Sequence, residues 1–216
     1  MELPIPTSKK FNVGCGPYHL KEGWTNIDIR PFDGVDLVFD VTNAWPCSND
    51  LEFVYGEHFI EHLSVDAAFL FLDNVYSSLL KGGIVRLSTP SLEWVLSTHF
   101  SLSNFSSSEI ISQTIGLNRA FYGWGHRFLY SRKMLEAILL SCGFSTVCFC
   151  DYGKSSRLAL CELEQHPGYT VIDNTFGSFP SVWIVEAEKI EDIPVIDVNL
   201  RNAVIKDFLS HVESGH

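Results

Sequence analysis

The feature that most constrains this chain is a short apolar run that ends in two glycines. Residues 9–17 read Lys-Lys-Phe-Asn-Val-Gly-Cys-Gly-Pro, which is typical of a strand that stops where the backbone turns tightly. Gly14 and Gly16 supply the positive φ and the missing Cβ that such a turn needs when it lies close to a ligand. A glycine turn after a strand is also common without a ligand, so the motif alone leaves both interpretations open.

The rest of the chain alternates short apolar runs with amphipathic segments, which predicts an α/β fold with a mostly parallel sheet. Further strands are expected at residues 24–29, 36–40, 51–55, 84–88, 145–152 and 181–188. Helices are expected at residues 65–80, 109–117, 131–140 and 198–212. The glycines at 82–83 are expected to end the first helix, and Ser131 is expected to cap the third.

Four residues stand where expected strands end. Ligands of such sheets bind outside the carboxyl ends of the strands. Gly14, Asp28, Asp40 and Glu57 each occupy that position along the chain. We therefore expect these residues to meet at one edge of the sheet and to form a ligand site.

The middle of the chain is rich in serine and aromatic residues. Residues 101–108 are expected to form a loop or the frayed start of a helix. Residues 121–127 read Phe-Tyr-Gly-Trp-Gly-His-Arg, a glycine-hinged aromatic segment. This segment is either a surface loop whose rings pack on the core or a lid over a site.

Composition and charge narrow the class of protein. We interpret the 216 residues as one domain (1–216), with a core at about 9–189 and a C-terminal helical extension at 190–216. A net charge of −11 argues against nucleic acid as a partner, because proteins that bind phosphates broadly carry a basic face. No apolar run is long enough to predict a membrane span.

Cysteine usage and the N-terminal residues favour a reducing compartment. The six cysteines include no Cys-x-x-Cys pair, which argues against a zinc ribbon, and we expect no bound metal. Residues 1–10 lack the apolar stretch of a secretory signal. We therefore expect a cytoplasmic protein with reduced thiols.

Five pieces of sequence, taken in order, resemble class I S-adenosylmethionine-dependent methyltransferases. They are Asn-Val-Gly-Cys-Gly, Gly-Trp-Thr-Asn-Ile-Asp, Phe-Asp-Val, Glu-His-Phe-Ile-Glu-His-Leu and Leu-Lys-Gly-Gly-Ile-Val-Arg-Leu-Ser-Thr-Pro. The chain looks closest to small predicted methyltransferases that are associated with polysaccharide or sugar pathways. The resemblance implies a Rossmann-like, mostly parallel seven-stranded sheet whose last strand is antiparallel, with helices on both faces. It also implies S-adenosyl-L-methionine as the cofactor.

The same resemblance implies cofactor contacts by position. Gly14 and Gly16 would approach the methionine and ribose portions of the cofactor, and Asp28 would accept hydrogen bonds from the ribose hydroxyls. Asp40 and the Val41 amide would read the adenine edge. The implied cofactor-binding residues are Asn12, Gly14, Cys15, Gly16, Asp28, Ile29, Asp40, Val41, Glu57 and His58.

The chain departs from the family pattern near the glycine turn. Asn12 stands where an acidic residue is usual, two positions before the first glycine. Tyr18 stands where the third glycine is usual, and the first helix looks shortened between Pro17 and Gly23. These departures bear on the contacts to the methionine portion of the cofactor.

The implied activity is methyl transfer to an unidentified small-molecule or sugar-type acceptor, and we expect transfer to oxygen. Such a reaction needs the acceptor atom placed in line, and a base where the acceptor is a hydroxyl. The candidate catalytic residues are His58, Glu61, His62 and His126, although a purely structural role explains each histidine as well. The candidate substrate-binding residues are Tyr122, Trp124 and Arg127, and Arg127 with Arg119 would hold a phosphate or carboxylate group.

Two other functions remain open from the sequence. Residues 58–62 read His-x-x-Glu-His, the inverted zinc-peptidase motif, which requires His58 and His62 to share one face of a helix. A non-catalytic methyltransferase-like protein that serves binding or assembly is the other alternative. The stripe Leu200, Val204, Phe208 and Val212 predicts either a helix packed on its own domain or a homodimer surface.

Overall fold

The fold is built on one seven-stranded sheet, in a computed structural model that describes residues 8–100, 106–175 and 177–213. Residues 1–7 and 101–105, for which the sequence raised expectations, lie outside the described residues. The strands are β1 (Lys10–Val13), β2 (Thr25–Asp28), β3 (Leu37–Val38), β4 (Leu51–Glu57), β5 (Leu79–Pro90), β6 (Thr146–Phe149) and β9 (Val182–Glu188). Their order across the sheet is β3-β2-β1-β4-β5-β9-β6.

The direction of the strands confirms the predicted fold class. The pairs β1–β2, β2–β3, β1–β4 and β4–β5 are parallel. The last strand, β9, is antiparallel to both of its neighbours, β5 and β6. Every predicted strand is present, and most are shorter than predicted because their ends leave the ladder to form the connecting turns.

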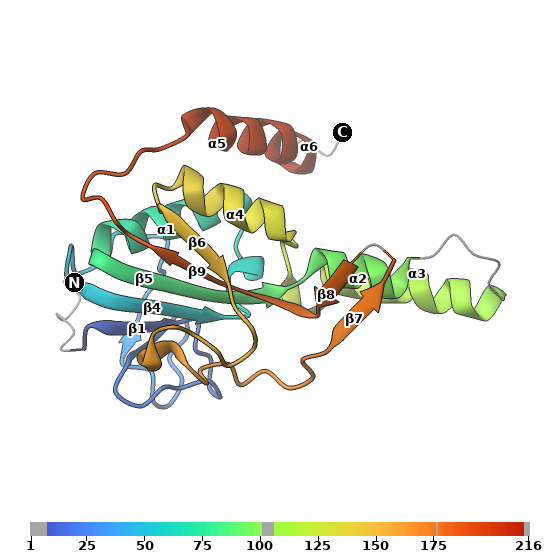
Figure 1. Cartoon of the computed structure of the whole chain (residues 1–216), viewed down its shortest axis with the longest axis horizontal. Coiled ribbons are helices and arrows are strands. Elements are labelled where there is room, and N and C mark those ends of the chain that lie inside the picture. Colours follow the sequence, from blue (N-terminus) through green and yellow to red (C-terminus); the bar gives the residue numbers. More distant parts are fainter. Residues whose placement is uncertain (1–7, 101–105, 176, 214–216) are drawn as a thin grey trace.

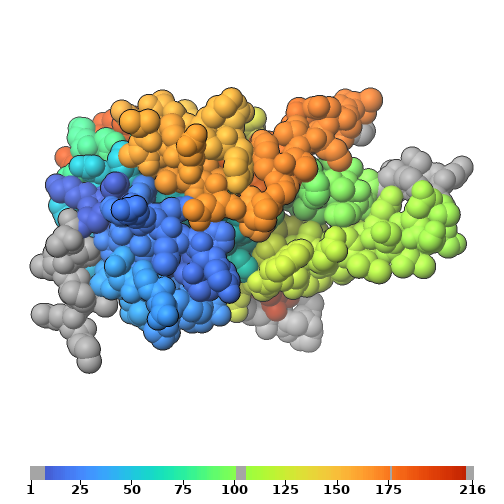
Figure 2. Space-filling view, turned by 90° about the horizontal axis from the view of Figure 1, so that it is seen from below, coloured from blue at the N-terminus to red at the C-terminus, as the bar shows by residue number. Residues whose placement is uncertain are grey.

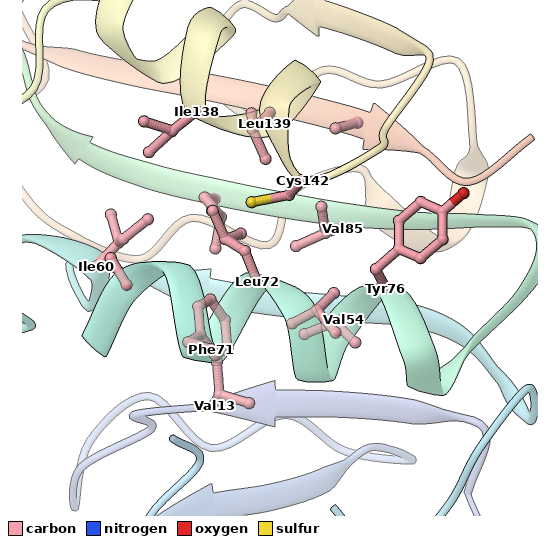
Figure 3. Close-up of a cluster of buried hydrophobic side chains, with 14 of the residues drawn as sticks. Val13, Val54, Ile60, Phe71, Leu72, Tyr76, Val85, Ile138, Leu139 and Cys142 are labelled. Atoms are coloured by element: carbon pink, nitrogen blue, oxygen red, sulfur yellow. The ribbon is translucent and has the colours of Figure 1, made fainter. Parts of the chain in front are cut away.

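Helices cover one face of the sheet (Figure 1). The inner layer consists of α1 (Val65–Ser78) and α4 (Arg132–Ser141), whose buried residues form the main core with the strands (Figure 3). Ser131 caps α4 by accepting a hydrogen bond from the Met134 amide, as predicted. None of the helices in the described part of the chain is long and apolar enough to cross a bilayer.

The predicted C-terminal helix forms as α5 (Val198–Val204), the π-helical turn η4 (Ile205–Leu209) and α6 (Ser210–Glu213). Val204 and Phe208 of the predicted stripe pack against the core of their own domain, whereas Val212 is exposed. Arg201 forms a bidentate ion pair with Asp73 of α1, which ties this helix to the inner layer.

The second face of the sheet has a smaller core under an irregular segment. Val54 and Tyr55 are neighbours on β4 and point to opposite faces, so Tyr55 belongs to this second cluster. Leu160, in the short 3₁₀ helix η3 (Leu158–Leu160), and Leu163 cover that cluster. Turns stand between β1 and β2, in place of the shortened helix that the sequence suggested.

A lobe projects beyond the carboxyl ends of the parallel strands (Figure 1) and stands out from the rest of the molecule in the space-filling view (Figure 2). It contains α2 (Leu92–His99), α3 (Ser107–Tyr122), the 3₁₀ turn η2 (Gly123–Gly125) and a hairpin of β7 (Val171–Asn174) and β8 (Gly177–Pro180). The α3 helix is longer than predicted, and Ser106 and Glu109 form a capping box at its start. The hairpin was not predicted, because its strands are short and mostly exposed.

One predicted helix end is wrong. The α1 helix stops at Ser78, and the glycines at 82–83 lie inside β5, where the pairing with β4 shifts register. Gly82 has a φ of +84°, and a Cβ at Gly83 would collide with backbone oxygens of Leu80 and Leu51. These glycines therefore allow the chain to form a β-bulge rather than to end a helix.

The two sides of α1 allow a matched test of the main core. Leu72 is fully buried, whereas Leu70 on the same helix is 52% exposed. We expect Leu72→Ala to lower the free energy of unfolding by about 2–5 kcal/mol, because it leaves a cavity. Leu70→Ala should change it by at most about 0.5 kcal/mol. Urea unfolding monitored by circular dichroism measures both, and equal effects would contradict this packing.

Candidate functional site

The carboxyl ends of β1, β2 and β4 open into one cavity of about 430 Å³. Seven of the residues predicted to bind a cofactor line it, which are Gly14, Gly16, Asp28, Ile29, Asp40, Val41 and His58. Arg30, Phe39, Phe59, His62, Leu63 and Trp124 complete the lining. The structure therefore brings together residues that lie up to 110 positions apart in sequence.

The glycine turn forms one wall of this cavity. Gly14 and Gly16 both adopt positive φ, at +64° and +53°. A Cβ on Gly14 would collide with the Phe59 ring, so this glycine is required by packing inside the protein. A Cβ on Gly16 would meet nothing within 4 Å, which means that this bare backbone faces open space.

The two carboxylates that line the cavity, Asp28 and Asp40, have different surroundings. Asp28 is buried, and its oxygens accept hydrogen bonds from the backbone amides of Gly16 and Arg30, both at 2.9 Å. Asp40 Oδ1 accepts from the amide and hydroxyl of Thr42, at 2.9 and 2.7 Å. A carboxylate offers about four lone-pair sites, so both retain acceptor capacity for a ligand.

Three of the predicted cofactor residues do not line the cavity. The Asn12 amide donates to the His19 carbonyl and to Asn26, each at 2.8 Å, and so holds the turn after β1. Cys15 is buried, and burial raises the pKa of its thiol to about 11. Glu57 Oε1 accepts from the amides of residues 165 and 166, at 2.7 and 2.8 Å. These side chains organise the walls of the site.

A second cavity of about 300 Å³ lies next to the first, under the projecting lobe. Its lining is largely apolar and aromatic, with several imidazoles and a single arginine. It consists of His58, Pro90, Trp94, Val95, His99, Gly116, Arg119, Ala120, Trp124, His126, His166, Pro167, Gly168, Ser181 and Val182. A polar group in an otherwise apolar cleft is the usual composition of a small-molecule site.

His58 and Trp124 line both cavities and mark their junction. Both residues have positive φ, at +46° and +56°, which is uncommon for residues other than glycine. The His58 amide donates to Ser88 at the end of β5, at 3.0 Å, which holds this conformation in place. Backbone strain of this kind costs about 1–3 kcal/mol and is concentrated at functional sites.

His58 has two close neighbours at this junction. Its Nδ1 lies 3.2 Å from Glu61 Oε1, and its ring stacks on His166 with centroids 3.9 Å apart. Desolvation and the nearby His58 lower the pKa of His166, which favours its neutral form. The Nε2 atom of His58 is buried and has no hydrogen-bond partner among the described residues.

Glu61 is fully buried in the 3₁₀ turn η1 (Ile60–His62), next to His62 of the first cavity. Its Oε2 accepts a hydrogen bond from the Thr89 hydroxyl at 3.0 Å. Residues 58–62 do not form the α-helix that the inverted zinc-peptidase motif requires, because His58 follows β4 directly and has a positive φ. His58 and His62 therefore do not share a helical face.

The aromatic segment 121–127 is hydrogen-bonded at its end to the η1 turn. The amides of Arg127 and Phe128 donate to the Glu61 carbonyl, at 2.7 and 3.2 Å, and Trp124 reaches over both cavities. The side chains of Tyr122 and Arg127 are exposed and line neither cavity. Among the predicted cationic groups, Arg119 on α3 is the one placed in the second cavity.

Several residues of the second cavity had no predicted role. Trp94 and His99 come from α2, and residues 166–168 come from the irregular segment between β6 and β9. A His-Pro-Gly stretch is an ordinary loop sequence, and a tryptophan in a short helix is ordinary packing. No local sequence pattern identifies these residues as lining a cavity, because they come together only in the tertiary structure.

Comparisons with solved structures support the fold. No protein-family model matches the sequence, and a search of curated proteins finds no match. The structure is similar to a SAM-dependent methyltransferase, possible histamine N-methyltransferase, from Thermotoga maritima (TM-score 0.52, 12% identity, 86% of this chain and 84% of that one). It is also similar to a SAM-dependent methyltransferase from Archaeoglobus fulgidus (TM-score 0.52, 18% identity, 83% and 85%).

A third similar structure is a possible exported protein from Bordetella parapertussis (TM-score 0.50, 14% identity). The match covers 84% of this chain and 62% of that one. Two of these three neighbours are thus named as SAM-dependent methyltransferases. At such low identities the likeness establishes a Rossmann-like methyltransferase fold and nothing further.

The Glu57 contacts lead to a test of how the second cavity is held. We expect Glu57→Ala to increase hydrogen exchange at the amides of residues 165 and 166, because it removes their charged acceptor. Such bonds contribute about 1.5–3 kcal/mol, so local exchange should rise roughly tenfold or more. Glu57→Gln should have an intermediate effect. Unchanged protection in Glu57→Ala, measured by mass spectrometry or NMR, would show that other contacts hold this segment.

Proposed function

We propose that this protein is a methyltransferase that uses S-adenosyl-L-methionine and transfers the methyl group to a small-molecule or sugar-type acceptor, on oxygen. The observation that carries the proposal is the pair of cavities that meet at His58 and Trp124. One cavity has the bare backbone and carboxylates suited to an adenosine. The other is a separate, largely apolar space for a second molecule.

The first cavity fits the cofactor in chemistry and size. Asp28, at the end of β2, has acceptor capacity left for the ribose hydroxyls, and the open space beside Gly16 admits a ligand against bare backbone. Asp40 and Val41 follow β3 and are positioned to contact the adenine edge. About 430 Å³ lies within the range of small-ligand sites. When bound, the cofactor supplies an electrophilic methyl group.

The second cavity supports an acceptor with a flat or partly apolar body. Trp94 and Trp124 provide aromatic surfaces for packing. Arg119 has no ion-pair partner among the described residues, so it is available for an anionic group on the acceptor. We therefore propose Arg119, rather than Arg127, as the residue that holds such a group, because Arg119 lines the second cavity and Arg127 does not.

His58 is the residue that we propose as the general base. It borders both cavities, and we propose that the acceptor hydroxyl binds at this junction beside its ring. Glu61 Oε1, 3.2 Å from Nδ1, favours the tautomer with a proton on Nδ1 and leaves Nε2 to accept the hydroxyl proton. His166 restrains the ring by stacking on it. Enclosing the acceptor between the lobe and the sheet also excludes water from the reacting atoms.

The first prediction of this proposal concerns cofactor affinity. We expect S-adenosylhomocysteine to bind the wild type, and Asp28→Asn and Asp40→Asn each to weaken binding about tenfold or more, because a charged acceptor is lost. Isothermal titration calorimetry measures these affinities. Asp33→Asn is the control, because Asp33 is exposed in the loop between β2 and β3 and does not line the cavity.

The wild-type measurement separates an enzyme from a fold that has lost its cofactor. Absence of binding by the folded wild type would refute the proposed function. Equal affinities for Asp28→Asn, Asp40→Asn and Asp33→Asn would show that the ligand binds elsewhere.

A second prediction concerns the base. We expect His58→Ala to lower methyl transfer by about 10²–10⁴-fold while binding of S-adenosylhomocysteine persists, because the proton has no acceptor. The assay follows labelled methyl groups from S-adenosyl-L-methionine into a panel of phenolic, sugar and hydroxy-acid compounds. His19→Ala is a control histidine near the site that lines neither cavity. A His58→Ala enzyme with wild-type turnover would exclude this histidine as the base.

A further inference from the structure

We propose that Glu61, His62 and His126 bind a divalent transition-metal ion, with Zn²⁺ as the best-suited probe, at the junction of the two cavities. The three residues offer ligand atoms that all lie within 4.8 Å of one another. Two imidazoles and one carboxylate form a common three-ligand set for a metal that keeps an open position. The inverted zinc-peptidase motif does not include His126, so this ligand set differs from it.

The spacing of the ligand atoms suits a single ion. Ligand bonds of about 2.0–2.2 Å around a tetrahedral centre place the ligand atoms roughly 3.4 Å apart. The observed separations, at most 4.8 Å, reach that geometry with small side-chain rotations. His62 and His126 are half-buried, and their rings lie edge to face with centroids 5.2 Å apart.

The buried carboxylate of Glu61 is the strongest argument for a cation. Its side chain is 0% exposed, and the only polar contact of its Oε1 among the described residues is His58 Nδ1 at 3.2 Å, which does not form a well-aligned hydrogen bond. Its only ion-pair contact among the described residues is to His58, and no lysine or arginine pairs with it. Burying a carboxylate charge with so few ion pairs and hydrogen bonds costs free energy, and a bound cation would neutralise that charge.

Neighbouring groups already orient two of the ligands. The Thr89 hydroxyl donates to Glu61 Oε2, and His126 Nδ1 lies 2.8 Å from the Ala120 carbonyl. The carbonyl fixes the proton on Nδ1 and leaves Nε2 of His126 free to bind a metal. Hydrogen bonds of this kind orient metal-binding histidines and carboxylates in general. Because a carboxylate has about four lone-pair sites, Glu61 can face His58 and the ion together.

The position of the cluster suggests what the ion does. His62 lines the first cavity and His126 the second, so the ion lies where both cavities meet. An open coordination position there would hold an oxygen of the acceptor and lower the pKa of its hydroxyl. This catalytic role rests on the proposed methyl transfer, whereas metal binding itself does not.

Metal binding by the full chain tests the proposal directly. Protein freed of metal with a chelator, and of any affinity tag, is titrated with Zn²⁺ by calorimetry. We expect one Zn²⁺ per chain, and at least tenfold weaker binding for His126→Ala and for Glu61→Gln. His99→Ala is the matched control, because His99 lines the second cavity outside the cluster, and it should retain wild-type affinity. Circular dichroism shows that each variant is folded.

The outcomes distinguish this inference from the proposed function. Failure of the wild type to bind Zn²⁺, or equal Zn²⁺ affinity in His126→Ala and the wild type, would overturn the metal site. Visible absorption of a Co²⁺ complex dominated by thiolate transitions would do the same, because it would assign the ion to cysteines. Binding of S-adenosylhomocysteine by metal-free protein tests the methyltransferase separately, so either proposal can fail alone.

Discussion

The architecture of this protein depends on one buried cation, Arg86, in the middle of β5. Its guanidinium is fully buried and donates to both oxygens of Glu164, at 2.7 and 3.0 Å, and to Glu186, at 2.5 Å. A charge buried in this way must be paired, and breaking such a pair costs about 3–5 kcal/mol. Because Glu164 belongs to the irregular segment after β6, the pairing fixes that segment across the second face of the sheet.

This segment then determines the shape of the site. Directly after Glu164, the chain reaches the carboxyl end of β4. There Glu57 accepts hydrogen bonds from the amides of residues 165 and 166, and the His166 ring stacks on His58. The second cavity exists because this stretch and the projecting lobe stand on either side of the strand ends. The two residues with positive φ, His58 and Trp124, lie between this stretch and the lobe. Packing and hydrogen bonds therefore offset the free-energy cost of their backbone conformations at the junction of the two cavities.

Prediction from sequence succeeded where a local pattern carried the information. The strands, the α1 and α4 helices and the clustering of Gly14, Asp28 and Asp40 at one edge follow from apolar periodicity and from the geometry of parallel sheets. It failed at Gly82, because a glycine that ends a helix and one that forms a bulge look the same in sequence. It also could not show that the Glu57 carboxylate contacts amides more than 100 residues away.

The sequence by itself determined the layered α/β fold and the edge of the sheet at which the first cavity forms. The reason is that the alternation of strands with helices, which apolar periodicity reveals, favours a parallel sheet whose strands end at one shared edge. Only the tertiary structure decided that there are two cavities, that His58 and Trp124 join them, and that Glu61 lies buried beside His62 and His126. These contacts join distant segments, and their geometry depends on burial and charge pairing that appear only once the whole chain has packed.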